Sequence, residues 1–447
     1  WLIQLICVMS AISLTHLTIN WQSDELIAQE LPFCQTLYNH HNQLHQDIQN
    51  CFAFFIENQA HLPLYCVSTS CAEHIQSQLG QYHLMLKEAL QHAFSLPLEQ
   101  LRHWFDCQAA HDLGFANFVD YAKTTFLEQR SQSVLTTSMP STIYGRLDAV
   151  VNPENGQVVG IYEFNGDTPV MLFESINLQN KIVTELGQAE NQANDWWFET
   201  QARLQAFTGK TVAVVCDVSY IEDCTTSETI AQVFEAIGAH VYFTTIESLN
   251  HTLLDIEKPF RIDGVATPPD AIFMLLPWEE MWTSGRDVLA HWQHWYKNVS
   301  FFEPPWRWFM SHKGLLAWAS YLYTEDERFA ERWAHVPHLR TEFSPDYFIS
   351  HQLDYVIKPV IGRLSQNIQI VKNNQLVTQT HGHYAHVPMI YQQYSPPLQV
   401  SGRPNMILGG WLAGDNVATL CFREFDGAVL DLQNERFMAH VLTPDPL

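Results

Sequence analysis

Basic residues are scarce in this sequence, which has 23 Lys and Arg against 48 Asp and Glu in 447 residues. The resulting formal net charge of −25 argues against a broad electrostatic grip on nucleic acid or on an anionic membrane, because such binding needs clustered Lys and Arg. The balance leaves open a cationic or neutral small substrate. Acidity alone does not choose between them, because most surplus carboxylates of an acidic protein are solvated surface.

Paired cysteines and long apolar runs are also lacking. The nine cysteines form no CxxC pair, which argues against a disulfide framework in a chain of this size and predicts a cytoplasmic protein. Residues 1–14 are uncharged and mostly apolar, but they are shorter than the roughly 18–20 residues that a membrane span needs. We interpret residues 1–20 as a spurious or a targeting extension, and we expect no membrane association.

The apolar patterning changes along the chain and divides it into three predicted regions. Residues 1–135 are expected to be helical, because apolar residues recur there at i, i+3 and i+4 and glycine and proline are sparse. Residues 136–300 are predicted to hold a β-hairpin (141–151 and 158–165) and a parallel α/β substrate domain. Its strands are predicted at 211–216, 240–244 and 271–276, with a helix over 227–237.

Residues 301–447 form the third region. A helix is predicted over 308–323, and short strands that favour antiparallel pairing follow it. The strands are predicted at 354–359, 367–371, 389–392, 406–411 and 417–423.

The predicted hairpin carries four residues whose chemistry suits a metal site. Strand alternation places Arg146 and Asp148 on one face, and it places Glu163 and Asn165 on one face of the partner strand. If the two faces coincide, two carboxylates and an amide oxygen meet beside a guanidinium, and Mg²⁺ prefers such oxygen ligands. The alternative is an ordinary surface Arg–Asp pair with a solvated Glu.

A second group of residues suits a phosphate. Lys358 ends a predicted strand, and Arg363 follows in a loop that contains Gly362, where backbone N–H groups can approach an anion. Lys313 is a further cation at a predicted helix start. Each lysine is alternatively a plain surface charge at the end of an element. The sequence contains neither GxGxxG nor GxxxxGK[ST], so the Rossmann and P-loop interpretations lack their motifs.

Another pair of acidic residues lies after the predicted strand 211–216, where α/β sheets present ligand-binding loops. Glu222 and Asp223 are therefore candidates for binding a cationic substrate. The alternative is a solvated loop pair.

Eight separated motifs from residue 144 onward keep an order and an internal spacing that mark a family. In chain order they are Tyr144–Asp148, Tyr162–Pro169 with Glu174 and Gln179, Leu276–Glu279, Glu303–Trp306 with Ser311–Lys313, Tyr355–Arg363 with Asn367, Ile390–Gln392, Gly410–Trp411, and Phe422–Glu424 with Asp426–Gly427. The sequence thereby resembles the glutathionylspermidine synthase family over roughly 300 residues. The resemblance implies a permuted ATP-grasp fold, in which a pre-ATP-grasp α/β domain precedes the nucleotide-binding part (301–447), here with a helical N-terminal part.

The resemblance also implies an activity. Family members join a carboxylate to an amine, with ATP hydrolysed to ADP and phosphate through an acyl-phosphate. The expected cofactors are ATP and Mg²⁺, with two ions. The expected partners are a small-molecule or peptide carboxylate and an amine such as a polyamine, and a homodimer is compatible with the sequence.

Residue roles follow from the same resemblance. Arg146 and Arg423 would be catalytic, stabilising the transferring phosphoryl group or the later intermediate, and Thr168 would face the peptide substrate. The Mg²⁺ ligands would be Asp148, Glu163 and Asn165. The ATP-binding residues would be Lys313, Lys358, Gly362, Arg363 and Gln392, the last in the adenine-side hinge.

The sequence departs from the family pattern in ways that leave alternatives open. Val170 replaces a second hydroxyl residue near the peptide substrate, and Ser365 replaces a glycine in the phosphate-covering loop. We expect no N-terminal amidase domain, and we interpret Cys66 and Cys71 as core thiols. The main rival is a catalytically reduced ATP-binding regulatory protein of the same fold, and a plain ATPase or kinase is a third interpretation.

Overall fold

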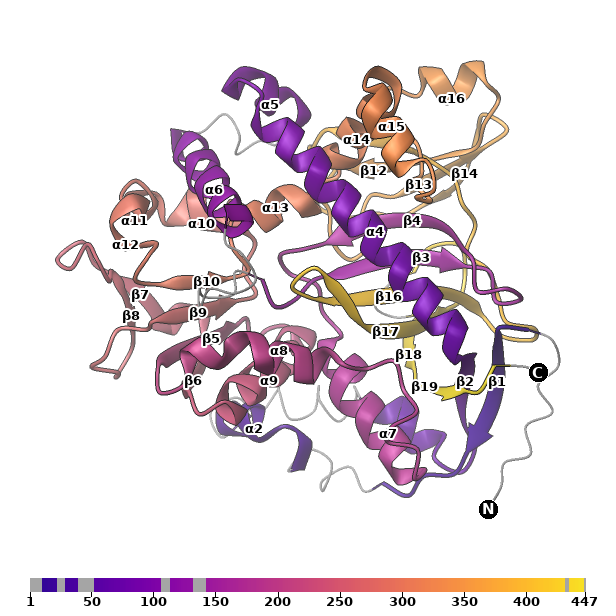
Figure 1. Ribbon diagram of the computed structural model, residues 1–447, viewed down its shortest axis with the longest axis horizontal. Coiled ribbons are helices and arrows are strands. Elements are labelled where there is room, and N and C mark those ends of the chain that lie inside the picture. The colour runs from indigo at the N-terminus through magenta and orange to yellow at the C-terminus, as the bar shows by residue number, and fades with distance from the viewer. Residues whose placement is uncertain are drawn as a thin grey trace.

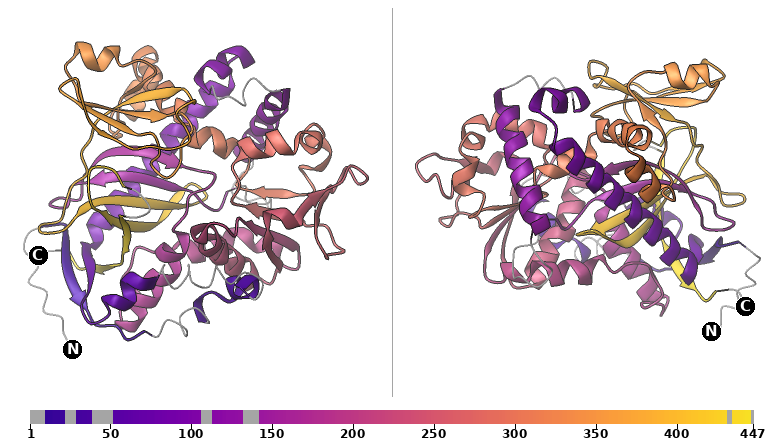
Figure 2. Two further views of the ribbon diagram at one scale, coloured as in Figure 1. Left: turned by 180° about the vertical axis from the view of Figure 1, so that it is seen from behind. Right: turned by 45° about the horizontal axis from the view of Figure 1, so that its top comes forward.

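Three main β-sheets with helices packed around them form the protein, a mixed α/β fold as the sequence predicts (Figure 1). The computed structural model describes residues 10–21, 29–38, 52–105, 113–131, 142–430 and 434–445. Seen from two further sides, the other two large sheets flank a central one (Figure 2).

The central sheet is antiparallel throughout and has the strand order β18-β17-β16-β3-β4. The predicted hairpin supplies β3 (Arg146–Val151) and β4 (Val158–Asn165), joined by a turn that contains Gly156 at φ 72°. Chain segments more than 200 residues apart therefore pair within one sheet. The other strands are β16 (Asn405–Ala413), β17 (Asn416–Phe425) and β18 (Glu435–Met438).

The second sheet is the predicted parallel α/β layer, with the strand order β10-β9-β5-β6. β5 (Thr211–Cys216) and β9 (Ala271–Met274) are buried at nearly every residue, because parallel strands are covered on both faces. The outer strands are β6 (His240–Thr245) and β10 (Ser300–Phe302). The helix after β5 is α9 (Ile221–Ala236), which begins six residues earlier than the sequence predicts.

The third sheet is antiparallel, with the strand order β11-β15-β12-β13-β14. The predicted strands become β12 (Tyr355–Pro359), β13 (Gln369–Lys372) and β15 (Met389–Gln393). β11 (Thr341–Glu342) and β14 (Gln375–Gln379) complete it.

The N-terminal region is helical only in part. α4 (Thr69–Phe94) buries Ile75, Leu79, Leu86 and Leu90, whose spacing makes one apolar stripe that packs on β17 and β4. However, Leu62–Ser68 forms strand β2, which pairs with β1 (Ile12–Leu17) and with the C-terminal strand β19 (His440–Thr443).

The helical prediction is therefore wrong at β2. This strand is an almost wholly buried apolar run, and its sequence pattern does not separate a strand from a helix. The segment 12–17, which we interpreted as part of an extension, belongs to the same sheet, and residues 1–9 lie outside the described part of the chain. Cys66 and Cys71 are buried, as expected.

The predicted helix 308–323 is divided into α13 (Trp306–Ser311) and α14 (Gly314–Glu325). None of the helices in the described ranges combines the length and apolar character that a membrane crossing requires. The central sheet spans the boundary predicted at residue 300, and the three-region division stays a prediction. The remaining elements are α2 (Pro32–Tyr38), α5 (Leu98–Trp104), α6 (Leu113–Ser131), the π-helical turn η2 (Glu174–Leu178), α7 (Gln179–Glu185), α8 (Trp196–Leu204), η3 (Gln205–Phe207), η4 (Ile246–Ser248), β7 (Leu249–His251), β8 (Phe260–Ile262), α10 (Trp278–Ser284), α11 (Arg286–Leu289), α12 (Trp292–Trp295), α15 (Glu327–Trp333) and α16 (Asp346–Ser350).

Candidate active site

A cavity of about 490 Å³ lies where the three sheets meet. Side chains from the central sheet, from the β5 and β9 ends of the parallel layer and from the loop after β12 all line it. All but one of the residues that the sequence analysis proposed for the site line this cavity. They are Arg146, Asp148, Glu163, Asn165, Thr168, Glu222, Asp223, Lys313, Lys358, Gly362, Arg363 and Arg423.

Asp148 is at the centre of the hairpin end of the cavity. Its two carboxylate oxygens accept hydrogen bonds from Arg146 Nε at 2.7 Å and Nη2 at 3.0 Å, and Arg423 Nη2 lies 2.6 Å from Oδ1. Burial acts to raise the pKa of Asp148, but the two guanidinium groups outweigh it and lower the pKa. Asp148 is therefore an anion throughout the neutral range.

The register of the hairpin brings both predicted faces together. Asp148 stands opposite Glu163, and Arg146 stands opposite Asn165, so all four side chains project to one side of the sheet. Asn165 Nδ2 donates to Asp148 Oδ2 at 3.1 Å. Two carboxylates and an amide thus share one face, and this donor set has the chemistry of a Mg²⁺ site.

Lys313 reaches this group from the break between α13 and α14. Its Nζ lies 3.2 Å from Glu163 Oε2 and donates to the Gly362 carbonyl oxygen at 3.3 Å. The next residue, Gly314, lets the backbone of Trp104 approach the start of α14, because a side chain at position 314 would overlap the carbonyl oxygen of Trp104. Burial acts to raise the pKa of Glu163, but its neighbouring lysines lower it.

Lys358 enters the cavity from the middle of the third sheet. Its side chain is buried, and its Nζ donates to Gln392 Oε1 at 2.8 Å. Burial lowers the pKa of Lys358 to about 8, a shift that Glu163 opposes. Gln392 does not line the cavity itself; it holds Lys358 from β15 and donates to the Tyr162 carbonyl oxygen at 3.0 Å.

Arg363 is surrounded by oxygen acceptors. Its Nη1 lies 2.7 Å from Glu279 Oε1, its Nη2 lies 3.4 Å from Asp167 Oδ2, and its Nε donates to Thr168 Oγ1 at 3.2 Å. Burial acts to lower the pKa of Arg363, and the two carboxylates raise it by a larger amount. The residue is a fixed cation beside Thr168.

The opposite end of the cavity is acidic. Burial, reinforced by Glu174 and Glu435, raises the pKa of Glu222 to about 8, and burial with Asp217 raises that of Asp223 to about 7. Glu222 and Asp223 lie in the first turn of α9, so the prediction that they belong to a loop is wrong. Burial is the main reason that these groups keep their protons, and it outweighs the opposing effect of Arg146 on Glu222 and of Arg363 on Asp223. A cationic ligand at this end would lower both pKa values.

The sequence analysis gave no role to several residues of this site. Glu279 and Glu174 are within the family motifs, which was the available signal. Asp167 is within a family motif as well. Glu435 gave no signal, because it reaches Arg423 Nη1, at 2.8 Å, only through the pairing of β17 with β18.

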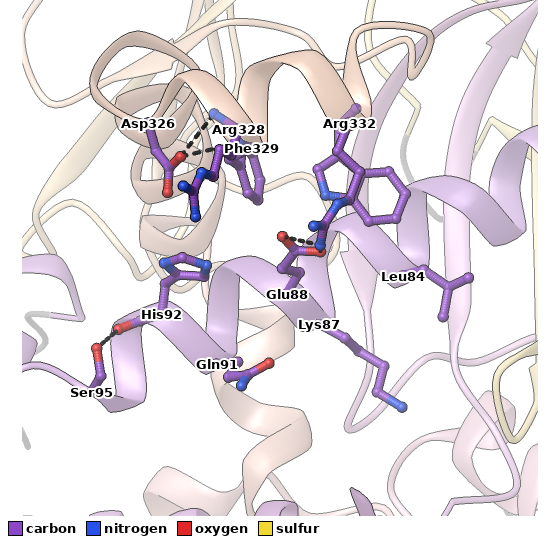
Figure 3. Close-up of a pocket in the computed structure, with 11 residues that line it drawn as sticks. Leu84, Lys87, Glu88, Gln91, His92, Ser95, Asp326, Arg328, Phe329 and Arg332 are labelled. Carbon is purple, nitrogen blue, oxygen red and sulfur yellow. Dashed lines mark hydrogen bonds and ion pairs between the residues drawn. The ribbon is translucent and has the colours of Figure 1, made fainter.

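A larger hollow, of about 870 Å³, lies between α4 and α15 on the outside of the molecule (Figure 3). Some of its polar side chains already have partners: Arg332 pairs with Glu88 at 2.9 Å, and Asp326 accepts from the backbone N–H groups of Arg328 and Phe329 in the first turn of α15. None of the sequence-predicted site residues lines it. The cavity at the junction of the sheets is therefore the candidate active site.

Comparisons with known proteins show the family to which the chain belongs. A family model described as glutathionylspermidine synthase preATP-grasp matches residues 117–443. The chain is 25% identical over 344 residues to a Haemophilus influenzae protein named "Putative acid--amine ligase", covering 73% of this chain and 81% of that protein. It is 23% identical over 327 residues to the trypanothione synthetase of Crithidia fasciculata, covering 65% of this chain and 46% of that one. Among solved structures, a glutathione synthetase-like effector from Globodera pallida matches with a TM-score of 0.45 and 11% identity, over 95% of this chain and 98% of that chain.

Proposed function

Because the chain belongs to the glutathionylspermidine synthase family, whose preATP-grasp region matches residues 117–443, we propose that it is an ATP- and Mg²⁺-dependent carboxylate–amine ligase. The reaction joins a peptide or small-molecule carboxylate to a polyamine or another amine through an acyl-phosphate. The observation that carries the proposal is one cavity with a cationic end built from the hairpin and the third sheet, and an acidic end beside α9.

The cationic end suits phosphoryl transfer. An oxygen of the substrate carboxylate attacks the γ-phosphorus of ATP, and ADP leaves with the electron pair of the broken P–O bond. Two anions approach each other in this step, so neutralisation of charge is the main requirement. Lys313 and Lys358 would hold the phosphates, and Arg146 and Arg423 would face the transferring group.

The predicted ligands, Asp148, Glu163 and Asn165, would hold Mg²⁺, which when bound supplies further positive charge to the phosphates. Arg146 and Arg423 keep Asp148 ionised, and Lys313 and Lys358 do the same for Glu163. The residues are thus ready to accept a cation without first losing protons.

The acidic end suits the amine. The amine nitrogen attacks the acyl carbon, phosphate leaves, and the nitrogen loses one proton as the amide forms. Glu222 and Asp223 would hold other ammonium groups of a polyamine and leave one amine directed at the acyl-phosphate. Thr168, next to Arg363, would contact the acid substrate at the junction of the two ends.

The test is a mass-spectrometric screen with purified protein, ATP and Mg²⁺. Glutathione and other short peptides are each combined with polyamines and amino acids, and the amide product and ADP are both measured. We expect ADP release tied to an amide product for at least one pair. ADP formation that needs no amine would indicate an ATPase or kinase, and ATP binding without ADP formation would indicate a regulatory protein; either outcome refutes the ligase.

A further inference from the structure

Two loop segments of the third sheet cover the phosphate end of the cavity, and we call them the flap: residues 362–367 and 380–384. The two segments are joined to each other, since Asn367 Oδ1 accepts from Tyr384 N at 2.8 Å and Gln366 Oε1 accepts from His383 N at 2.9 Å. Leu364 and Ser365 have φ values of 54° and 53°, a left-handed conformation that non-glycine residues keep only when their surroundings hold them.

An ion pair ties this flap to the parallel layer. Arg363 of the flap pairs with Glu279 in the first turn of α10, with 2.7 Å between Nη1 and Oε1. The second oxygen of Glu279 accepts from Trp308 Nε1, also at 2.7 Å. Both carboxylate oxygens are thus fixed, one by the flap and one by a buried indole of α13, and the Glu279 side chain is 17% exposed.

We propose that Glu279 is a positioning residue for the ligation reaction, one that holds the flap over the phosphates through Arg363. The proposal rests on the ligase function for its kinetic consequence, while its structural consequence stands alone. Glu279 suits the role because Trp308 holds its carboxylate independently of the flap. The carboxylate therefore meets the Arg363 guanidinium in one fixed geometry. Asp167, at 3.4 Å from Nη2, is a longer and weaker alternative for the same guanidinium.

A held flap matters chemically because an acyl-phosphate is open to attack by water. While the flap covers the phosphates, water is excluded until the amine arrives. Release of the flap would let water take the place of the amine, giving ADP and phosphate without an amide bond. The ratio of phosphate to amide product therefore reports on Glu279 in a way that a general loss of stability does not.

Hydrogen exchange of the full-length chain tests the structural part. We expect Glu279→Ala to speed amide exchange in the flap by about tenfold or more, the effect of losing hydrogen bonds to a charged group. Glu279→Gln keeps one acceptor and loses one, so its effect should be intermediate. Glu331→Ala is the control, because Glu331 is exposed on α15 and does not line the cavity, and it should leave flap exchange unchanged.

Kinetics test the functional part. With the substrate pair found by the screen, Glu279→Ala should raise the ratio of phosphate to amide product and the KM for ATP several-fold. Unchanged flap exchange in Glu279→Ala, or exchange that rises evenly through the whole chain, would overturn the proposal. If Glu279→Ala does not fold, Glu279→Gln decides on the same criteria. Failure of the ligase function is seen separately, as a wild-type protein that makes no amide while the exchange result stands.

Discussion

Lys358 is expected to lower the stability of the folded protein when no ligand is bound. Burial lowers its pKa from 10.5 to about 8, and each pKa unit corresponds to about 1.4 kcal/mol. The difference, 10.5 − 8 = 2.5, corresponds to about 3 kcal/mol of unfavourable free energy for keeping the charged lysine in the folded state. A methionine of similar length would avoid this cost.

The substitution Lys358→Met also removes a contact. Gln392 Oε1 would lose its donor in a buried position, which costs about 1–3 kcal/mol. The expected net result is a free energy of unfolding about 1 kcal/mol higher than that of the wild type, together with loss of ATP binding. A more stable protein that no longer binds nucleotide would mean that the lysine is retained for the ligand.

The sign of the pH dependence follows from the lowered pKa. Below about pH 8 the lysine is protonated in both the folded and the unfolded state, so the full cost is present. Between pH 8 and 10.5 only the unfolded state keeps the proton, and the stability of the wild type rises with pH. The advantage of Lys358→Met should therefore shrink above pH 8.

Urea denaturation at pH 7 and pH 9 measures the stabilities, and calorimetry measures ATP binding. Lys210→Met is the control, because Lys210 is exposed and the same change there should alter stability by less than about 0.5 kcal/mol. The reasoning fails if Lys358→Met is less stable than the wild type by more than about 1 kcal/mol, or if it binds ATP as the wild type does.

Three further predictions concern the metal end, the amine end and the core. Asp148→Asn should lower kcat for ligation at least about a hundredfold in an ADP-release assay. Chelation of Mg²⁺ by EDTA should weaken ATP binding by about tenfold in calorimetry. Unchanged values in either assay would contradict the assignment of Asp148 as a metal ligand. The pKa of Glu222 is raised to about 8, so this carboxyl becomes negatively charged as the pH rises from 6.5 to 8.5. The KM for the amine should therefore fall over that range, and Glu222→Gln should flatten this pH dependence of the KM. Arg307→Met should lower the free energy of unfolding by about 3 kcal/mol in urea denaturation. The reason is that Arg307 is fully buried and its Nε lies 3.1 Å from Oε2 of the equally buried Glu303. A loss below about 1 kcal/mol would show that this pair is unimportant for stability.

Local patterns were enough to predict the parts of the fold that lie close together in sequence. The hairpin strands and the buried strand 211–216 match β3, β4 and β5 within five residues, because an Asn-Gly turn signal marks the hairpin and β5 is a short run rich in β-branched valine. β2 was missed, since it is stabilised by pairing with β19, which lies more than 350 residues away. No local pattern contains that information.

The candidate site likewise combines features that local sequence predicts with features that depend on tertiary contacts. Strand alternation in the sequence predicted that Asp148 and Glu163 would share a face if the two strands paired in the right register. The observed register does place them opposite each other. The contact of Lys313 with Glu163 depends on the break after α13 and on the close approach of Trp104 to Gly314. Both are tertiary features, so the sequence could place Lys313 in the site only through the family resemblance.

The scarcity of basic residues takes on a specific meaning at this cavity. Four cations at its cationic end already face carboxylates: Arg146 and Arg423 share Asp148, Lys313 faces Glu163, and Arg363 faces Glu279, whereas Lys358 donates to the neutral Gln392. In the proposed ligase, the phosphates of ATP would therefore displace carboxylates from some of these cations, and the displaced carboxylates would need new positive partners. At Asp148 and Glu163 that partner is the expected Mg²⁺, whereas at Glu279 no metal is expected, and the Arg363 pair remains. In the proposed mechanism, the pair of Arg363 with Glu279 would hold the flap while the nucleotide is bound.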